Sequence, residues 1–308
     1  MEDRKRNLRE QRAFYRKGLC RGASPAGEKL PENAGKKKRG QKMFMEGRTG
    51  HPAWETLRKY RYAHRGYHDK PQIPENSLAA FRRAIEHGWG AELDVHLMKD
   101  GTLAVSHDSC MKRCTGVDVC IEDLTKEELS RLRLEGTDEH VPLFDEVLDL
   151  FEYATPLVIE IKTHNGNHAA VTEAVCRRLD SYKGDFCIES FDPRCLMDLK
   201  RLRPDICRGQ LAENFVENDD ELPKWQRYAL TNLLFNIKTK PDFIAYKFSD
   251  RGNKNLRRCI DAGVQEVHWT IRSGEDMEQS EKEGALVIFE KFDPDAVENN
   301  GAAGCESR

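Results

Sequence analysis

The sequence predicts an α/β protein, a (β/α)8 TIM barrel with a small insertion after the second strand and a basic N-terminal extension. From Tyr60 onward, short apolar segments alternate with longer amphipathic ones, which is typical of repeated βα units. Eight of the short segments can be counted, and eight parallel strands close a barrel. A chain of 308 residues has room for a barrel of about 250 residues. A doubly wound parallel sheet is the alternative fold.

Strands are expected where apolar runs are short, and helices where apolar residues recur at helical spacing. The expected strands are 61–64, 91–96, 157–162, 185–189, 206–210, 242–246, 265–269 and 285–289. The expected helices are 78–87, 143–153, 168–181, 193–202, 224–235, 253–262 and 275–283. The first helix has the clearest limits, because Asn76 and Ser77 precede its start as capping residues and Gly88 follows its end.

Residues 102–140 depart from the plain repeat. They hold a short apolar run ending at His107, and then a polar, turn-rich stretch with a small helix at 125–133. We expect this segment to be an insertion at the active-site end of the barrel. The predicted division is therefore a basic, disordered extension at 1–57, a barrel domain at 58–295 and a C-terminal tail at 296–308.

The N-terminal region differs from the rest of the chain in charge. Residues 1–50 contain 15 Lys and Arg against 6 Asp and Glu, although the whole chain has a net charge of −3. Such a tail suits weak contact with a membrane surface. It lacks aromatic interleaving and any binding motif, so no nucleic acid partner is expected. An upstream start codon, with the chain beginning at Met43 or Met45, is the other interpretation.

Composition and the N-terminal sequence favour a cytoplasmic location. No apolar run reaches the roughly 20 residues that span a bilayer, and the charged N-terminus does not resemble a secretory signal. The ten cysteines are scattered without the regular spacing of a disulfide framework, so we expect them to be reduced thiols. Cys110, Cys114 and Cys120 have a spacing that matches no common zinc site.

Two expected strands carry charges where a buried barrel strand should be apolar. Glu92 and Asp94 lie two residues apart in one, and Glu160 and Lys162 lie two apart in another. Side chains at i and i+2 of a strand point to the same side, and both pairs lie toward the C-terminal ends of their strands. That end is the catalytic mouth of such a barrel, where three carboxylates suit a divalent metal such as Mg2+ or Ca2+. A structural ion-pair network at the rim is the alternative.

Two histidines end apolar runs in a similar way. His64 precedes Arg65-Gly66, and His107 precedes Asp108. Beside a carboxylate cluster, two histidines at strand ends are a plausible acid/base couple. Arg65 and Lys162 would supply fixed positive charge for a phosphoryl oxygen.

Taken together, these residues resemble the motifs of the glycerophosphodiester phosphodiesterase family. The matching motifs, in order, are His64-Arg65-Gly66, Pro74-Glu75-Asn76-Ser77, Glu92-Leu93-Asp94-Val95, Asp100-Gly101, His107-Asp108, Glu160-Ile161-Lys162, Ser190-Phe191-Asp192-Pro193 and Trp269-Thr270. The resemblance covers roughly residues 60–295. One departure is at the eighth strand, where the family's Thr-Asp is missing from 284–290 and the contribution of this strand to the mouth is in question.

The resemblance implies a role for each matching position. Glu92, Asp94 and Glu160 would be the metal ligands, and His64 and His107 would be the general acid and base. Arg65 and Lys162 would contact the phosphate, and Trp269 would contact the glycerol or the leaving group. Glu75 would orient His64 or Arg65, and Asn76 would shape the loop over the metal. The implied reaction is metal-dependent hydrolysis of a small-molecule glycerophosphodiester to glycerol 3-phosphate and an alcohol. A barrel-core role is the alternative for Trp269.

Three other functions remain open at this point. A phospholipase D-like enzyme that cleaves lysophospholipids would use a similar site, but it needs an apolar path for an acyl chain, and the insertion is polar. A catalytically inactive barrel could serve as a binding module, although it would be free to lose some of these polar residues. A retaining glycosidase needs only two carboxylates and leaves both histidines unexplained.

Overall fold

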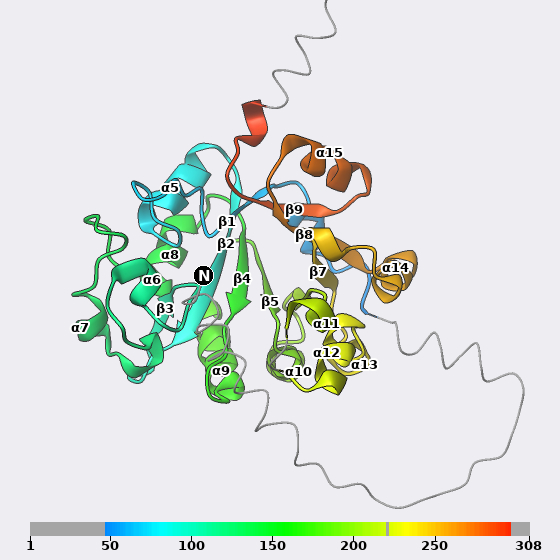
Figure 1. The fold of residues 1–308 in the computed structure, drawn as a ribbon, viewed down its shortest axis with the longest axis horizontal. Helices are drawn as coiled ribbons and strands as arrows, with labels where there is room; N and C mark the ends of the chain where they lie inside the picture. Colours follow the sequence, from blue (N-terminus) through cyan, green and yellow to red (C-terminus); the bar gives the residue numbers. More distant parts are fainter. Residues whose placement is uncertain (1–46, 220–221, 297–308) are drawn as a thin grey trace, which may run out of the picture.

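The computed structural model describes residues 47–219 and 222–296, and within these ranges the chain forms a closed parallel barrel surrounded by helices (Figure 1). Each barrel strand pairs in parallel with the next, and the last strand pairs with the first. The strands are β1 (Tyr62–His64), β2 (Gly90–Leu97), β4 (Leu157–Ile161), β5 (Phe186–Ser190), β6 (Arg208–Ala212), β7 (Phe243–Lys247), β8 (Gln265–Ile271) and β9 (Leu286–Phe289). The predicted (β/α)8 barrel is confirmed, and the doubly wound sheet is excluded.

Helices lie where the periodicity predicts them. They are α5 (Leu78–Glu86), α8 (Phe144–Phe151), α9 (His168–Leu179), α10 (Pro193–Leu202), α12 (Lys224–Thr231), α14 (Lys254–Asp261) and α15 (Gly274–Lys282). Ser77 caps α5, since its Oγ accepts a hydrogen bond of 3.1 Å from the Ala80 backbone N–H. The predicted helix 224–235 is wrong at its end: α12 ends at Thr231, because Leu233 has a φ of +58°, and the short α13 (Asn236–Thr239) follows.

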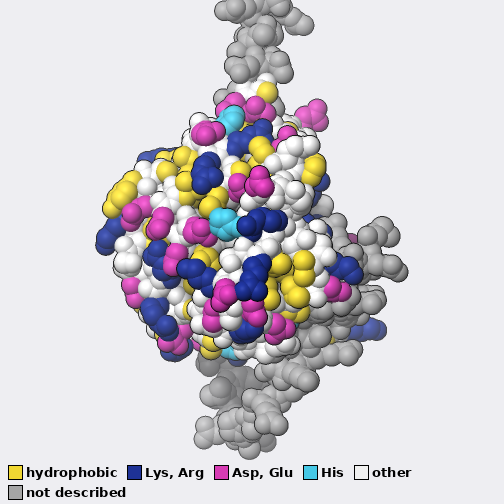
Figure 2. All heavy atoms as spheres, turned by 90° about the vertical axis from the view of Figure 1, so that its left-hand side faces the viewer, with side chains coloured by type: hydrophobic (Ala, Val, Ile, Leu, Met, Phe, Trp, Pro, Cys, Tyr) yellow, Lys and Arg dark blue, Asp and Glu magenta, His cyan; other side chains and the backbone are white. Residues whose placement is uncertain are grey.

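The insertion follows β2, as predicted. It begins with β3 (Leu103–Val105), which pairs antiparallel with β2, and continues through α6 (Lys112–Thr115), the 3-10 turn η1 (Ile121–Asp123) and α7 (Lys126–Leu129). A small core of its own, which includes Met111, Ile121 and Leu129, fixes it against the barrel. Positive and negative side chains are interspersed over the face of the molecule that includes the insertion (Figure 2).

The segment before β1 packs on the barrel. The short helix α4 (Trp54–Leu57) buries Trp54 against Phe243, with ring centroids 5.5 Å apart. Nε of Arg48 lies 2.7 Å from Oδ1 of Asp242. The packed chain therefore begins before the predicted domain limit at residue 58. The rest of the predicted extension, residues 1–46, and nearly all of the predicted C-terminal tail lie outside the described residues.

The barrel interior has an apolar layer and a charged layer. Inward-facing Tyr62, Val158, Cys187 and Ile288 belong to one apolar cluster that also includes Trp54 of α4. Two residues further along the same four strands come His64, Glu160, Glu189 and Glu290, which face the same way because side chains alternate along a strand. The polar residues therefore collect at the C-terminal ends of the strands. Among the described residues, no helix is long and apolar enough to cross a membrane.

Candidate active site

Three buried carboxylates meet at the mouth of the barrel. Glu92 and Asp94 belong to β2 and Glu160 to the neighbouring β4, where Asp94 and Glu160 are partners in register. One ligand atom from each residue lies within 4.8 Å of the other two. None of the three residues is more than 6% exposed. The structure thus brings together the three residues that the sequence pattern selected as metal ligands.

The electrostatics of this carboxylate cluster fit a divalent cation. Burial, followed by repulsion from Asp94 and Glu160, raises the pKa of Glu92 well above its usual range. Burial likewise raises the pKa of Glu160 to about 7. A cation held by carboxylate oxygens would offset both the loss of hydration and the repulsion, and this donor set suits Mg2+ or Ca2+.

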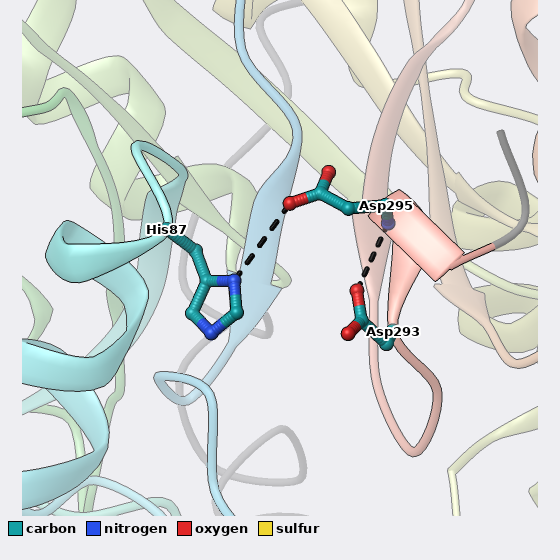
Figure 3. A group of neighbouring side chains, drawn as sticks. All are labelled: His87, Asp293 and Asp295. Carbon is teal, nitrogen blue, oxygen red and sulfur yellow. Dashed lines mark hydrogen bonds and ion pairs between the residues drawn. The ribbon is translucent and has the colours of Figure 1, made fainter. Parts of the chain in front are cut away.

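A second group of ligand-type side chains, His87, Asp293 and Asp295, lies at the surface, where His87 and Asp295 are exposed and Asp293 is partly exposed (Figure 3). Nδ1 of His87 lies 3.7 Å from Oδ2 of Asp295, and the imidazole stacks on Trp89 with ring centroids 4.3 Å apart. Exposed acidic groups of this kind stay hydrated without an ion. Burial therefore distinguishes the carboxylate cluster at the mouth from this surface group.

Two positive side chains contact the carboxylate cluster. Nζ of Lys162 lies 2.8 Å from Oδ1 of Asp94 and 2.7 Å from Oε1 of Glu160. Nε of Arg65 lies 3.7 Å from Oδ2 of Asp94, and the Arg65 backbone N–H donates to Oε2 of Glu92 at 3.0 Å. Lys162 is buried and Arg65 is partly buried at the mouth, where fixed positive charge favours a phosphate group.

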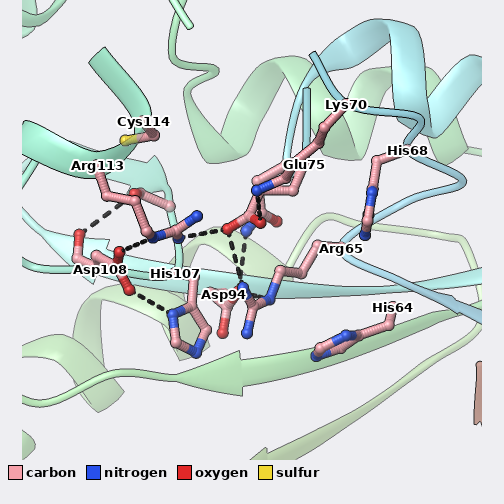
Figure 4. Close-up of polar contacts among 12 residues, drawn as sticks. His64, Arg65, His68, Lys70, Glu75, Asp94, His107, Asp108, Arg113 and Cys114 are labelled. Atoms are coloured by element: carbon pink, nitrogen blue, oxygen red, sulfur yellow. Dashed lines mark hydrogen bonds and ion pairs between the residues drawn. The ribbon is translucent and has the colours of Figure 1, made fainter. Parts of the chain in front are cut away.

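The two histidines are held in the same manner. Nδ1 of His64 lies 2.7 Å from Oε2 of Glu290, and Nδ1 of His107 lies 2.6 Å from Oδ1 of Asp108. Nε2 of His64 lies 3.9 Å from Oε2 of Glu92. Figure 4 shows the two imidazoles on opposite sides of Asp94. A carboxylate at Nδ1 fixes the ring orientation and leaves Nε2 for proton transfer.

Burial and nearby cations keep both imidazoles neutral. Burial, followed by the charge of Arg65, lowers the pKa of His64 below its usual range. Burial, followed by Arg65 and Lys162, lowers the pKa of His107 to about 4. Both rings therefore lose a proton more readily than a free imidazole does.

Glu75 joins the mouth to the insertion. Its Oε1 accepts hydrogen bonds from Nη1 of Arg65 at 2.9 Å and from Nη2 of Arg113 at 2.5 Å, and Lys70 pairs with its Oε2. Arg113, on α6, also donates through Nε to Asp108. Glu75 therefore orients Arg65, one of the two targets expected for it, whereas His64 is oriented by Glu290.

The loop that carries Arg65 requires an unusual backbone. Arg65 and Gly66 have φ values of +58° and +77°, and a Cβ on Gly66 would lie 2.9 Å from the backbone carbon of Ala80. Only glycine fits this approach without strain. Asn76, with a φ of +54°, donates from its backbone to the Arg65 carbonyl at 2.9 Å and from Nδ2 to Oδ2 of Asp94 at 2.9 Å. It thus ties this loop to the carboxylate cluster.

Trp269 lies at the mouth end of β8 and is partly exposed. Its ring packs against Phe191 with centroids 5.6 Å apart, and its Nε1–H donates to the Ala245 carbonyl at 3.1 Å. It also contacts the inner apolar cluster of the barrel. The ring therefore packs against the barrel core and lies at the mouth, and its contact with glycerol or the leaving group stays a prediction.

Four further site residues were missed in the sequence. They are Asp108 and Glu290, which hold the histidines; Arg113, which bridges Asp108 and Glu75; and Glu189 of β5, the register partner of Glu160. Glu189 is 1% exposed, and its Oε2 has no hydrogen-bond partner among the described residues. A charge inside an apolar strand, the signal used for Glu160, would have found Glu189.

Comparisons with known proteins identify the family of the chain. Residues 64–292 match the model of the glycerophosphoryl diester phosphodiesterase family. A protein of Caldanaerobacter subterraneus subsp. tengcongensis named glycerophosphodiester phosphodiesterase is 32% identical over 248 residues, which cover 77% of this chain and 95% of that protein. A rat protein named lysophospholipase D GDPD1 is 40% identical over 104 residues, covering 30% of this chain and 33% of its own length.

Solved structures show the same fold. A glycerophosphodiester phosphodiesterase of Thermotoga maritima has a TM-score of 0.58 and 28% identity, and the match covers 75% of this chain and 94% of that one. A phosphodiesterase of Oleispira antarctica has a TM-score of 0.65 at 24% identity, with 80% and 98% covered.

A barrel whose mouth combines clustered carboxylates, fixed cations and two oriented histidines belongs, by these comparisons, to the phosphoric diester hydrolases. More narrowly, the chain belongs to the glycerophosphoryl diester phosphodiesterase family.

Proposed function

We propose that this enzyme hydrolyses glycerophosphodiesters to glycerol 3-phosphate and an alcohol, with a divalent metal cofactor. The proposal depends on one observation above all, the buried cluster of Glu92, Asp94 and Glu160 between two oriented histidines. A relative that shares 32% identity across nearly its full length is named for this activity. Membership of the family supports the same substrate class.

In this proposal Glu92, Asp94 and Glu160 hold Mg2+ or Ca2+ at the mouth. A cation held by these carboxylates would supply positive charge for a phosphoryl oxygen and would favour deprotonation of a hydroxyl. Arg65 and Lys162 bind the other non-bridging phosphoryl oxygen, since both lie beside the cluster and keep their charge. The phosphodiester is thereby fixed against the wall of the barrel formed by β1, β2 and β4.

The two histidines move the protons. One imidazole takes a proton at Nε2 from the attacking hydroxyl. The other imidazole must first bind a proton at Nε2, and it then donates that proton to the departing alcohol oxygen. Glu290 and Asp108 stabilise the imidazolium that forms at each step, because each carboxylate accepts from Nδ1 of its histidine. Trp269 provides an apolar face for the glycerol or the alcohol that leaves.

The test is release of glycerol 3-phosphate from glycerophosphocholine, glycerophosphoethanolamine and glycerophosphoglycerol, first in EDTA and then with added Mg2+ or Ca2+. The proposal is supported if added metal restores turnover and if His64→Ala and His107→Ala each abolish it. His87→Ala is the matched control, because this histidine is exposed and lies in the second group of ligand-type residues. Turnover that survives EDTA would contradict the metal dependence, and near-normal rates in either mouth variant would remove that histidine from the mechanism.

A second candidate function is cleavage of lysophospholipids. The relative named lysophospholipase D shares 40% identity over 104 residues. In addition, an apolar recess between α10 and α12, lined by Met197, Leu230 and Phe235, begins directly after β5. As it stands the recess is too small for an acyl chain, so this function would require the recess to widen. Faster turnover of lysophosphatidylcholine than of glycerophosphocholine would favour this function, and no turnover of either would favour the inactive barrel.

A further inference from the structure

Cys110 and Cys120 face each other across a short antiparallel contact within the insertion. The two residues form an isolated antiparallel bridge. The Met111 backbone N–H donates to the Val119 carbonyl at 2.9 Å, and the Ile121 N–H donates to the Ser109 carbonyl at 2.9 Å. These hydrogen bonds lie on either side of the cysteine pair, so Cys110 and Cys120 occupy a non-hydrogen-bonded pair of the ladder.

This position matches the geometry of a disulfide bond. The Cα atoms of a non-hydrogen-bonded pair are about 4.5 Å apart, and their side chains lie on the same side of the ladder. A disulfide spans Cα separations of about 4.4–6.8 Å. The backbone of the folded protein therefore already has the spacing that a disulfide requires, while Sγ of Cys110 lies 3.5 Å from Oδ1 of Asp118.

The two cysteines are also the accessible ones. Both are partly exposed, whereas the other six cysteines in the described ranges are buried. Buried Cys114, on α6 between the two, is the competing thiol, and burial raises its pKa to about 12. A thiol must ionise and reach its oxidant to react, so Cys114 is the poorer partner.

We propose that Cys110 and Cys120 form a reversible disulfide, an oxidation site in the insertion that is distinct from the carboxylate cluster. One cysteine thiolate attacks a low-molecular-weight disulfide such as oxidised glutathione, forms a mixed disulfide and releases one small thiolate. The second cysteine thiolate attacks the protein sulfur of this mixed disulfide and releases the other small thiolate. Two cysteine thiols are oxidised, and one small disulfide is reduced to two thiols.

The bond would close a loop that carries part of the active-site support. Arg113 lies inside the loop formed by residues 110–120, and it donates to both Asp108 and Glu75. Asp108 in turn accepts from His107. A disulfide here fixes the loop in the arrangement that already holds His107, so oxidation should stabilise the protein without displacing the histidine.

The test uses the full chain in its native state, incubated with oxidised glutathione, blocked with iodoacetamide and digested with trypsin. Cleavage after Lys112 and Arg113 separates the two cysteines, so the disulfide should link peptides 100–112 and 114–126. Because the second peptide also contains Cys114, the variant Cys114→Ala is needed, and it should keep the link. Cys120→Ser should lose it.

We expect the melting temperature of the oxidised protein to rise by about 5 °C or more, since closing a short loop restricts the unfolded chain. The variant Cys110→Ser should show no such rise under the same treatment. The proposal is overturned if iodoacetamide still alkylates both Cys110 and Cys120 after the native protein has been treated with oxidised glutathione. It is also overturned if Cys114→Ala abolishes the link between the two peptides. A melting temperature that falls on oxidation would show that the disulfide does not fit the folded backbone.

Discussion

Glu290, the residue directly after β9, places its Oε2 atom 2.7 Å from Nδ1 of His64. The eighth barrel strand thereby contributes to the mouth although it lacks the Thr-Asp of the family pattern. The position follows from strand alternation, because Ile288 faces the barrel interior and Glu290 is two residues further on. Glu290 and Asp108 hold their histidines in equivalent ways, from opposite ends of the barrel sequence.

We expect Glu290→Gln to lower kcat by roughly 10- to 100-fold with little change in KM. The amide keeps the shape of the side chain but no longer stabilises a positive imidazole at His64. Steady-state kinetics with glycerophosphocholine measures the effect. Arg272→Ala is the matched control. Arg272 is half exposed and pairs with Oε1 of Glu290, whereas His64 contacts Oε2, so its effect should be smaller. Wild-type kcat in Glu290→Gln would exclude this role.

Metal binding should stabilise the fold through the carboxylate cluster. At a Mg2+ or Ca2+ concentration of 100 times Kd, the gain is about 2.7 kcal/mol, or several degrees in melting temperature. Asp94→Asn and Glu160→Gln should lose most of this shift, because each removes a charged ligand. Asp293→Asn should retain it, since Asp293 belongs to the surface group beside His87. A shift that depends on Asp293 instead would place the ion at the surface group.

Strand periodicity was sufficient to predict both the fold and the centre of the site. Because Glu92 and Asp94 are two residues apart in a strand, their side chains point to the same side. Because these charges lie near the C-terminal end of an otherwise apolar strand, they are expected at the mouth of the barrel. These are local properties of the sequence. They do not depend on how the insertion folds.

The supporting contacts could not be predicted, because they join segments that are distant in sequence. Arg113 reaches Glu75 across 38 residues, and Glu290 reaches His64 across 226. Only the folded insertion and the closed barrel bring these pairs together. The single helix predicted over 224–235 failed for a different reason, since hydrophobic periodicity carries no information on the positive φ of Leu233.

Glu75 should make stability depend on pH in a defined window. Burial opposes its charge, but Arg65, Arg113 and Lys70 hold the pKa of Glu75 well below its usual range. A carboxylate with a depressed folded-state pKa stabilises the protein above its unfolded pKa of about 4.5, and this contribution is lost as the pH falls below that value. The difference in the free energy of unfolding between wild type and Glu75→Gln should therefore be largest near pH 7.

Removing one partner of a buried charge network costs about 3–5 kcal/mol, which sets the expected size of that difference at neutral pH. It should shrink progressively below pH 4.5, and urea unfolding at several pH values measures it. Glu127→Gln is a control, because Glu127 is 80% exposed and pairs only with Arg131 of the same turn. A difference that grows as the pH falls would contradict the charge assignment.

The apolar layer below the site depends on Gly209 of β6. A Cβ at this position would lie 2.0 Å from Cε2 of Phe243, which itself packs against Trp54 of α4. Gly209→Ala should therefore lower the free energy of unfolding by about 1–3 kcal/mol, since a packed interior does not absorb an added methyl group. Gly252→Ala is the matched control: its Cβ would meet no atom within 4 Å, so the change should stay within about 0.5 kcal/mol. Replacing the ring in the double variant Gly209→Ala/Phe243→Leu should recover part of the lost free energy of unfolding. Urea midpoints of the wild type, the two glycine variants and the double variant measure this directly. If Gly209→Ala and Gly252→Ala have the same urea midpoint, the apolar layer around Gly209 is less tightly packed than these contacts require.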